Sequence, residues 1–193
     1  MKPKEENKIP KTGRIGRFAK IVEKKASRGP FLKIMEKSID YGKYKPGKKA
    51  QWWSNTIDIL ENELGAENAI EVMNACGSKC CGQGQRRTAK RLMTESPSIE
   101  GFLEKVSKHG VKEGELEYKL IDENTIIGKY YRCFCGQVKK SNKPFKSDTY
   151  CQCSAEFNKR FFEAAFDKTV EVELKQSILN GDDFCEFEIN LKI

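Results

Sequence analysis

The sequence predicts an α+β fold in which helices pack on an antiparallel sheet, with a helical and basic N-terminal extension. The first part of the chain repeats apolar residues at helical spacing, over residues 14–108. The second part contains stretches that alternate apolar and polar residues between turn signals, with one more helical pattern among them. A chain of 193 residues is long enough for one well-packed domain plus an extension, so we expect a single core.

Two short helices are predicted over residues 14–40, on either side of Gly29-Pro30. Residues 41–49 then resemble a basic linker. Trp52-Trp53 marks its end, just before a candidate helix cap at Ser54.

Three further helical patterns follow, over residues 57–76, 85–94 and 98–108. Gly65 interrupts the first pattern, which then resumes and ends at Cys76. A glycine-rich turn separates it from the second. These patterns predict that a helix presents Cys76 at its C-terminal end.

The second part of the chain begins with a predicted hairpin. Residues 115–121 alternate, a turn follows, and residues 125–135 are β-branched and aromatic enough to form the returning strand. The hairpin is therefore expected to end in Cys133-Phe-Cys135.

One helix and two strands complete the expected fold. A polar loop leads to Cys151-Gln-Cys153, after which Ser154 can cap a helix over residues 155–166 with a buried phenylalanine stripe. The last strands are predicted at residues 170–174 and 185–193.

Positive charge is concentrated at the N-terminal end. Residues 1–50 contain sixteen of the 36 Lys and Arg but only five of the 28 Asp and Glu, a balance of +11, so the remainder carries −3. We therefore divide the chain into a basic N-terminal extension with short helices, residues 1–50, and a Cys-rich α+β ligand-binding domain, residues 51–193. The extension could hold nucleic acid by charge, but no nucleic-acid-binding motif accompanies it.

The composition also sets the expected environment of the eight cysteines. No stretch approaches the roughly 20 apolar residues that a membrane span needs, and no signal-peptide core follows the first lysines. We therefore expect a cytoplasmic protein with no membrane span. In that compartment, reduced thiols, metal thiolates or catalytic thiols are expected rather than a disulfide framework.

Seven of the eight cysteines fall into three groups, and two of these groups predict a metal site. In a C-x-C pair on an extended segment, both sulfurs project from one face. Two pairs would complete a tetrahedral thiolate set, with zinc as the expected metal and an iron–sulfur cluster as the alternative. The common zinc spacing C-x-x-C is absent. The candidate metal ligands are Cys133, Cys135, Cys151 and Cys153.

The third cysteine group precedes the helix predicted over residues 85–94. Unpaired backbone N–H groups at a helix N-terminus stabilise an anion, either a thiolate or a bound carboxylate. The candidate nucleophiles are therefore Cys80 and Cys81, although a loop with buried thiols would give the same pattern. The candidate ligand-binding residues around them are Cys76, Gly82, Gly84, Arg86 and Arg87.

Other interpretations of single residues remain open. Free cysteine often packs as a small apolar residue, which suits Cys185 because it alternates with Phe187 and Ile189. Exposed thiols could oxidise to disulfides within or between the pairs. The single histidine, His109, precedes Gly110 at a predicted helix end, where contact with the last carbonyls explains it better than catalysis.

Segments near the end of the chain carry a resemblance to known proteins. They are Val170-Glu-Val-Glu-Leu and Asn180-Gly-Asp-Asp-Phe-Cys185-Glu-Phe-Glu-Ile. They resemble the end of 4-vinyl-reductase-type small-molecule-binding domains and of L-2-amino-thiazoline-4-carboxylate hydrolase-like proteins. The Cys-rich segments are similar to an uncharacterised branch of that superfamily, and the likeness spans roughly residues 52–193.

The resemblance implies an antiparallel sheet packed by helices around an internal ligand pocket. In sensor members of the superfamily, a zinc site uses cysteines before and at the final strand. Here Cys185 matches the last of them, while Ser177 stands where an earlier cysteine would fall. This departure shifts the metal prediction to the two C-x-C pairs.

Three functional hypotheses follow from the sequence. The first is a metal-thiolate domain that binds a small organic ligand in a sensor or accessory role. The second is a hydrolase that cleaves a C–N or C–S bond in a small cyclic, cysteine-related substrate with a cysteine thiolate. The third is nucleic-acid binding through the basic N-terminus, which would be steeply salt-dependent.

Overall fold

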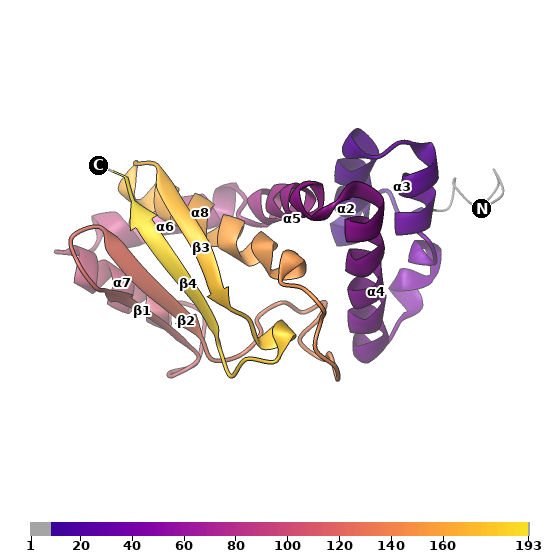
Figure 1. The fold of residues 1–193 in the computed structure, drawn as a ribbon. Helices are drawn as coiled ribbons and strands as arrows, with labels where there is room; N and C mark the ends of the chain where they lie inside the picture. Colours follow the sequence, from indigo (N-terminus) through magenta and orange to yellow (C-terminus); the bar gives the residue numbers. More distant parts are fainter. Residues whose placement is uncertain (1–8, 193) are drawn as a thin grey trace.

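The computed structural model describes residues 9–192 (Figure 1). Within this range seven α-helices and a four-stranded antiparallel sheet form an α+β fold, which confirms the predicted class. Helices α6, α7 and α8 lie on one side of the sheet, while α2, α3 and α4 form a separate helical layer that α5 joins to the rest (Figure 1). None of the helices between residues 9 and 192 is long and apolar enough to cross a membrane.

The N-terminal half is helical, as predicted, but the end of the expected linker, residues 46–49, belongs to a helix. Pro46 occupies the first turn of α4, where its fixed φ suits a helix start and its missing N–H is not needed. Trp52 and Trp53 therefore lie inside α4, and Ser54 does not cap it. The first helices are α2 (Gly13–Lys25), α3 (Arg28–Ile34), α4 (Pro46–Leu64) and α5 (Ala66–Cys80).

Helices α6 (Gln83–Thr94) and α7 (Ile99–Lys108) follow closely after α5. Gly65 separates α4 from α5 with a φ of +79°, a conformation that glycine adopts without strain. Helix α5 continues one turn beyond Cys76 to Cys80, so the prediction that Cys76 ends the helix is wrong. At α7 the hydroxyl of Ser98 accepts a hydrogen bond from the backbone N–H of Gly101 and caps the helix.

The sheet has the strand order β1-β2-β4-β3. Every neighbouring pair is antiparallel, and Tyr118, Gly128 and Phe187 lie opposite one another across the three strands β1, β2 and β4. Burial alternates along β4, and Cys185 is buried as the alternation predicted. The strands are β1 (Leu116–Leu120), β2 (Thr125–Tyr130), β3 (Val170–Gln176) and β4 (Cys185–Leu191).

Neither C-x-C pair lies on an extended strand, which corrects the prediction. Strand β2 ends at Tyr130, so Cys133-Phe-Cys135 falls in the irregular segment beyond it. Cys151 ends a short 3₁₀ turn and Cys153 already belongs to helix α8 (Gln152–Phe166). Ser154 is thus inside α8 rather than its cap. In helical geometry, residues two positions apart do not face the same side.

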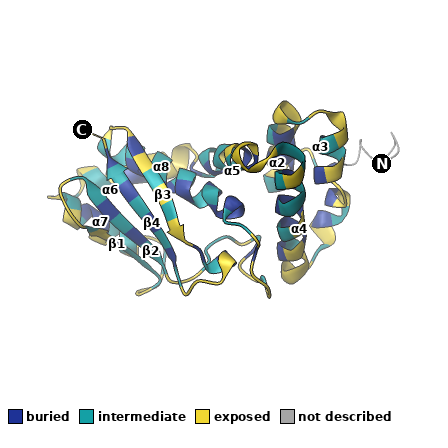
Figure 2. Cartoon of the chain, in the orientation of Figure 1, coloured by how far each residue is buried: buried dark blue, intermediate teal, exposed yellow. Residues whose placement is uncertain are grey.

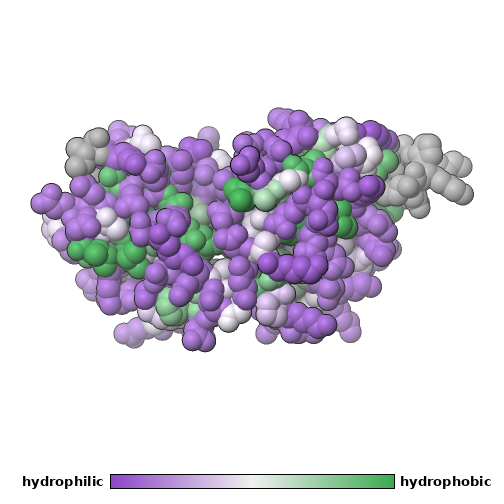
Figure 3. All heavy atoms as spheres, in the orientation of Figure 1, coloured by the Kyte–Doolittle hydropathy of each residue, from purple (hydrophilic) through white to green (hydrophobic). Residues whose placement is uncertain are grey.

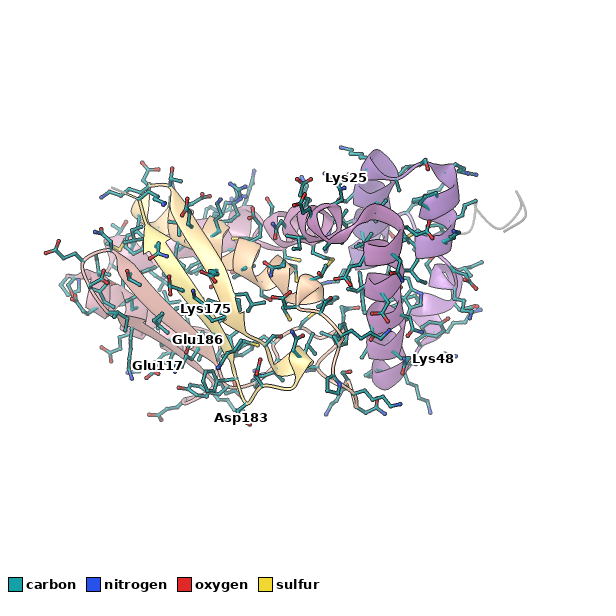
Figure 4. The ribbon with its side chains drawn as sticks, in the orientation of Figure 1. Lys25, Lys48, Glu117, Lys175, Asp183 and Glu186 are labelled. Carbon is teal, nitrogen blue, oxygen red and sulfur yellow. The ribbon has the colours of Figure 1, made fainter. Side chains whose placement is uncertain are left out.

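One face of the sheet is covered and the other is charged. Helices α7 and α8 contact β1 and β3 on the covered face. On the other face, ion pairs join Lys129 to Glu186 and Lys175 to Glu173. Figure 2 shows intermediate and exposed residues alternating with buried ones along these strands, and Glu117, Lys175 and Glu186 are labelled in Figure 4. The protein surface seen in Figure 3 is largely hydrophilic.

The buried residues form two apolar clusters. One is centred on the N-terminal helices, where the ring of Phe18 lies edge-on to Trp53 at 4.9 Å between centroids. The other fills the space between the sheet and helices α6, α7 and α8, with Phe102, Phe162 and Phe187 at its centre. Helix α5 packs against both α2 and α8 and so links the two clusters.

Candidate functional site

A cavity of about 450 Å³ lies between helices α7 and α8, the β1–β2 hairpin and the segment after β2. This volume is in the range of pockets that hold small organic molecules, roughly 300–1,000 Å³. Its walls are mainly apolar side chains from separate elements. They are Val106, Val111, Leu116, Phe134, Phe157 and Phe161.

The phenylalanines predicted to form one buried stripe on α8 pack in two different places. Phe162 and Phe166 pack on Phe102 in the core of the sheet side. Phe157 and Phe161, one helical turn apart, line the cavity with rings inclined by only 15° and centroids 6.2 Å apart. The second pair therefore supplies two stacked aromatic rings to the cavity lining.

Two tyrosines and an asparagine form a polar group beside these rings. Tyr118 and Tyr130 line the cavity, and their hydroxyls donate to Oδ1 of Asn158 at 2.6 and 3.0 Å. Burial raises the pKa of Tyr130 to about 12 and that of Tyr118 well above its ordinary value, so both phenols are neutral. Gly128 makes room for them, because a Cβ there would lie 2.5 Å from Cε1 of Tyr118.

The other polar part of the cavity combines a guanidinium with three cysteines. Cys80, Cys135 and Cys153 line the cavity together with Arg14, which comes from α2. Nη1 of Arg14 donates to Sγ of Cys135 at 3.4 Å, and that sulfur hydrogen-bonds Oη of Tyr150 at 3.2 Å. Burial raises the pKa of Cys153 well above its ordinary value, so this thiol keeps its proton at neutral pH.

The remaining members of the two C-x-C pairs lie outside the cavity lining. Cys151 accepts a hydrogen bond from Oγ of Ser177 at 3.0 Å, and the backbone N–H of Ile178 donates to Sγ of Cys185 at 3.4 Å. Burial raises the pKa of Cys133 to about 11 and raises that of Cys151 further. The pairs are thus split, with one thiol of each at the cavity and one beside the β3–β4 connection.

The structure brings the predicted metal ligands into one region without forming a ligand set. Among residues 9–192, no group of three or more His, Cys, Asp or Glu side chains is arranged to hold a metal ion. The zinc site, and its iron–sulfur alternative, therefore stay predictions.

The glycine-rich turn separates the two predicted nucleophiles. Cys80 lines the cavity, whereas Cys81 is fully buried and faces the other way, towards the second apolar cluster. Burial raises the pKa of Cys81, and the nearby Arg86 lowers it only in part. The single histidine, His109, lines the same cavity as Cys80, but among residues 9–192 it forms no hydrogen bond to that sulfur. The other predicted ligand-binding residues, Cys76, Gly82, Gly84, Arg86 and Arg87, also lie outside the cavity lining.

The sequence pattern did not point to Arg14, Tyr118 or Tyr130, which line the cavity, or to Asn158, which accepts hydrogen bonds from both tyrosines. The sequence did carry one signal, since Gly128 lies opposite Tyr118 in the hairpin and a glycine in a strand often marks a close approach. Nothing in the sequence pattern distinguished Arg14 from the fifteen other basic residues of the extension.

The chain belongs to a family of unknown function, DUF6144, whose sequence profile matches residues 28–193. No curated protein matches it. Two solved structures are similar. One is trafficking protein particle complex subunit 3 from Naegleria fowleri covalently bound to palmitic acid, with TM-score 0.45, 14% identity and coverage of 76% of this chain and 96% of the other. The second is an H-NOX protein from S. oneidensis in the Fe(II)NO state, with TM-score 0.44, 14% identity and coverage of 98% and 95%. The more specific resemblance to 4-vinyl-reductase-type domains and L-2-amino-thiazoline-4-carboxylate hydrolase-like proteins stays a prediction.

Proposed function

We propose that this member of the family binds a small organic molecule in the cavity between α7, α8 and the β1–β2 hairpin, in a sensor or accessory role. The observation that carries the proposal is the composition of the cavity. Apolar walls enclose about 450 Å³, and a few polar groups converge on that space. Pockets of this kind bind the apolar body of a ligand through their walls and orient it through their polar groups.

The aromatic part of the lining suits a ligand with a ring. The stacked rings of Phe157 and Phe161 line the cavity, and an aromatic ligand can pack on them face to edge or offset-stacked. Burial of a ring there gains roughly 25 cal/mol for each Å² of apolar surface removed from water.

The tyrosine pair can orient such a ligand. The hydroxyls of Tyr118 and Tyr130 lie within hydrogen-bond distance of Oδ1 of Asn158 and 2.9 Å from one another, and each oxygen keeps a further lone pair that can accept from a ligand. A ligand N–H or O–H group placed beside them would be recognised. The two side chains are held by the sheet and by α8, so this recognition requires little reorganisation.

A fluorescent probe tests the proposal directly. N-phenyl-1-naphthylamine is neutral, aromatic and brightly fluorescent in apolar surroundings, and we expect it to bind the protein saturably. Ser154, in the first turns of α8, lines the cavity, so Ser154→Phe fills the space and should abolish the signal. Thr169→Phe adds the same ring at an exposed position outside the cavity and should leave binding unchanged. Absence of saturable binding, or equal loss in both variants, would contradict the proposal.

The metal-thiolate role is a second proposal. The observation that favours it is that Cys135 and Cys153, one from each predicted pair, line the same part of the cavity. A bound metal there would deprotonate the thiols that hold it and stabilise the fold. A hydrolase role would use Cys80, the predicted nucleophile that lines the cavity.

A further inference from the structure

We propose that the ligand is an organic anion, an aromatic or similarly compact carboxylic acid, and that Arg14 is the residue that selects it. This inference rests on the proposed function, because it names the class of molecule that the cavity accepts.

The guanidinium of Arg14 lacks an acidic partner. No Asp or Glu among residues 9–192 forms an ion pair with it, whereas Arg160 on α8 pairs with both Glu156 and Glu163, at 2.7 and 3.0 Å. Among residues 9–192, the guanidinium donates one hydrogen bond, to Sγ of Cys135 at 3.4 Å. A thiol sulfur is a weak acceptor, and a guanidinium has five N–H donors, so most of its binding capacity is unused.

The surroundings of this cation make the missing partner costly. Arg14 is half-buried and lines the cavity beside Cys80 and Cys153. A charge held away from water without a counter-charge is unfavourable, and a protein tolerates it where a ligand supplies the opposite charge. The carboxylate geometry fits, because two parallel N–H groups of a guanidinium can each donate to one carboxylate oxygen.

The remaining features of the cavity describe the rest of the molecule. The ring pair of Phe157 and Phe161 favours an aromatic body, and the oxygens of Tyr118 and Tyr130 favour a donor group distinct from the carboxylate.

The test compares two competitors of nearly equal shape. Bound N-phenyl-1-naphthylamine is displaced by 2-naphthoate, an anion, and by 2-naphthylmethanol, its neutral counterpart. In the wild-type protein we expect 2-naphthoate to compete at least about tenfold better, the factor that a charge-assisted hydrogen bond supplies. In Arg14→Met that preference should vanish while the neutral probe still binds. Lys20→Met, which removes an exposed positive charge from the same helix, should leave the preference intact.

Each outcome separates this inference from the proposed function. If the neutral probe binds but the two naphthalene competitors are equal in the wild-type protein, the anion preference is wrong and the binding pocket stands. If the preference survives Arg14→Met, another cation selects the ligand. If the neutral probe never binds, the proposed function fails first. Should Arg14→Met fail to fold, Arg14→Gln removes the charge while keeping a polar side chain, and a preference unchanged in that variant would also overturn the role of Arg14.

Discussion

At Gly77, helices α5 and α8 approach so closely that no other residue fits. A Cβ at this position would lie 2.9 Å from the carbonyl carbon of Cys153 and closer still to its oxygen. Backbone atoms cannot move aside as a flexible side chain can. Gly77 therefore sets the separation of the two helices that carry Cys80 and Cys153 to the cavity.

We expect Gly77→Ala to destabilise the protein by about 1–3 kcal/mol, because it forces α5 and α8 apart. The measurement is the free energy of unfolding in denaturant, under reducing conditions. Gly84→Ala is the matched control, since a Cβ there meets no atom within 4 Å and the exchange in a helix should be neutral or gain about 0.4–1 kcal/mol. Equal stability of Gly77→Ala and wild type would mean that the helices do not pack as described.

Individual residues show how far the site could be predicted. The cysteine groups pointed to the right region because their clustering is visible in sequence, and Cys80, Cys135 and Cys153 do share a cavity. Arg14 could not be found, because its neighbour Cys135 is 121 positions away and only the fold brings the two together. One basic residue among many others in the segment cannot be recognised from a sequence pattern.

Among the elements, helix α2 connects the N-terminal layer to the cavity. One face of α2 is buried, with Phe18 fully inaccessible and its ring 4.9 and 6.5 Å from the rings of Trp53 and Trp52. Because Arg14 lies one turn before Phe18, the packing of this ring also positions the guanidinium. The division of the chain into two domains at residue 50 stays a prediction. Weakening the packing of α2 tests how firmly the two parts are joined.

We expect Phe18→Ala to cost about 3–5 kcal/mol of unfolding free energy, as removal of a buried aromatic side chain does. Thermal and denaturant unfolding measure the loss, and probe displacement by 2-naphthoate should weaken with it. Lys20→Ala, at an exposed position on the same helix, is the control. A loss below about 1 kcal/mol would show that α2 is only loosely docked.

Element boundaries explain why the C-x-C pairs were predicted on extended segments. Cys151-Gln-Cys153 has no residue that forces an extended backbone, and Gln152 adopts helical angles of φ −57° and ψ −26°. The helix therefore starts before Ser154, which looked like a cap in the sequence. The error at Pro46 was of a different kind. A proline in a basic stretch suggested a linker, but this proline begins α4.

For the molecule as a whole, the α+β class could be predicted from the periodic spacing of apolar residues. Long helical patterns and alternating strands are local properties of the sequence, so they survive in the fold. The cavity is not a local property. Its lining comes from α2, α5, α6, α7, α8, two strands and a connecting segment, and only the packing of all of them creates the space. The sequence pattern could therefore not predict which residues line the cavity.

The metal prediction also depends on the whole fold, because it requires the two split cysteine pairs to come together in space. If they do, protein purified without oxygen should carry about one zinc ion, or an iron–sulfur chromophore, per chain. Metal analysis and the visible absorption spectrum measure this. The variant with Cys133, Cys135, Cys151 and Cys153 all changed to Ser should lose the metal, and chelation should lower the melting temperature of the wild type only.

Cys81→Ser provides the control for that experiment, because Cys81 is buried in the cluster on the sheet side and faces away from the four predicted ligands. It should keep the full metal content. Colourless, metal-free wild-type protein that is folded and indifferent to chelator would contradict the metal site. The thiols at the cavity would then not serve as metal ligands, and the guanidinium of Arg14 would remain in the cavity lining to recognise an anionic ligand.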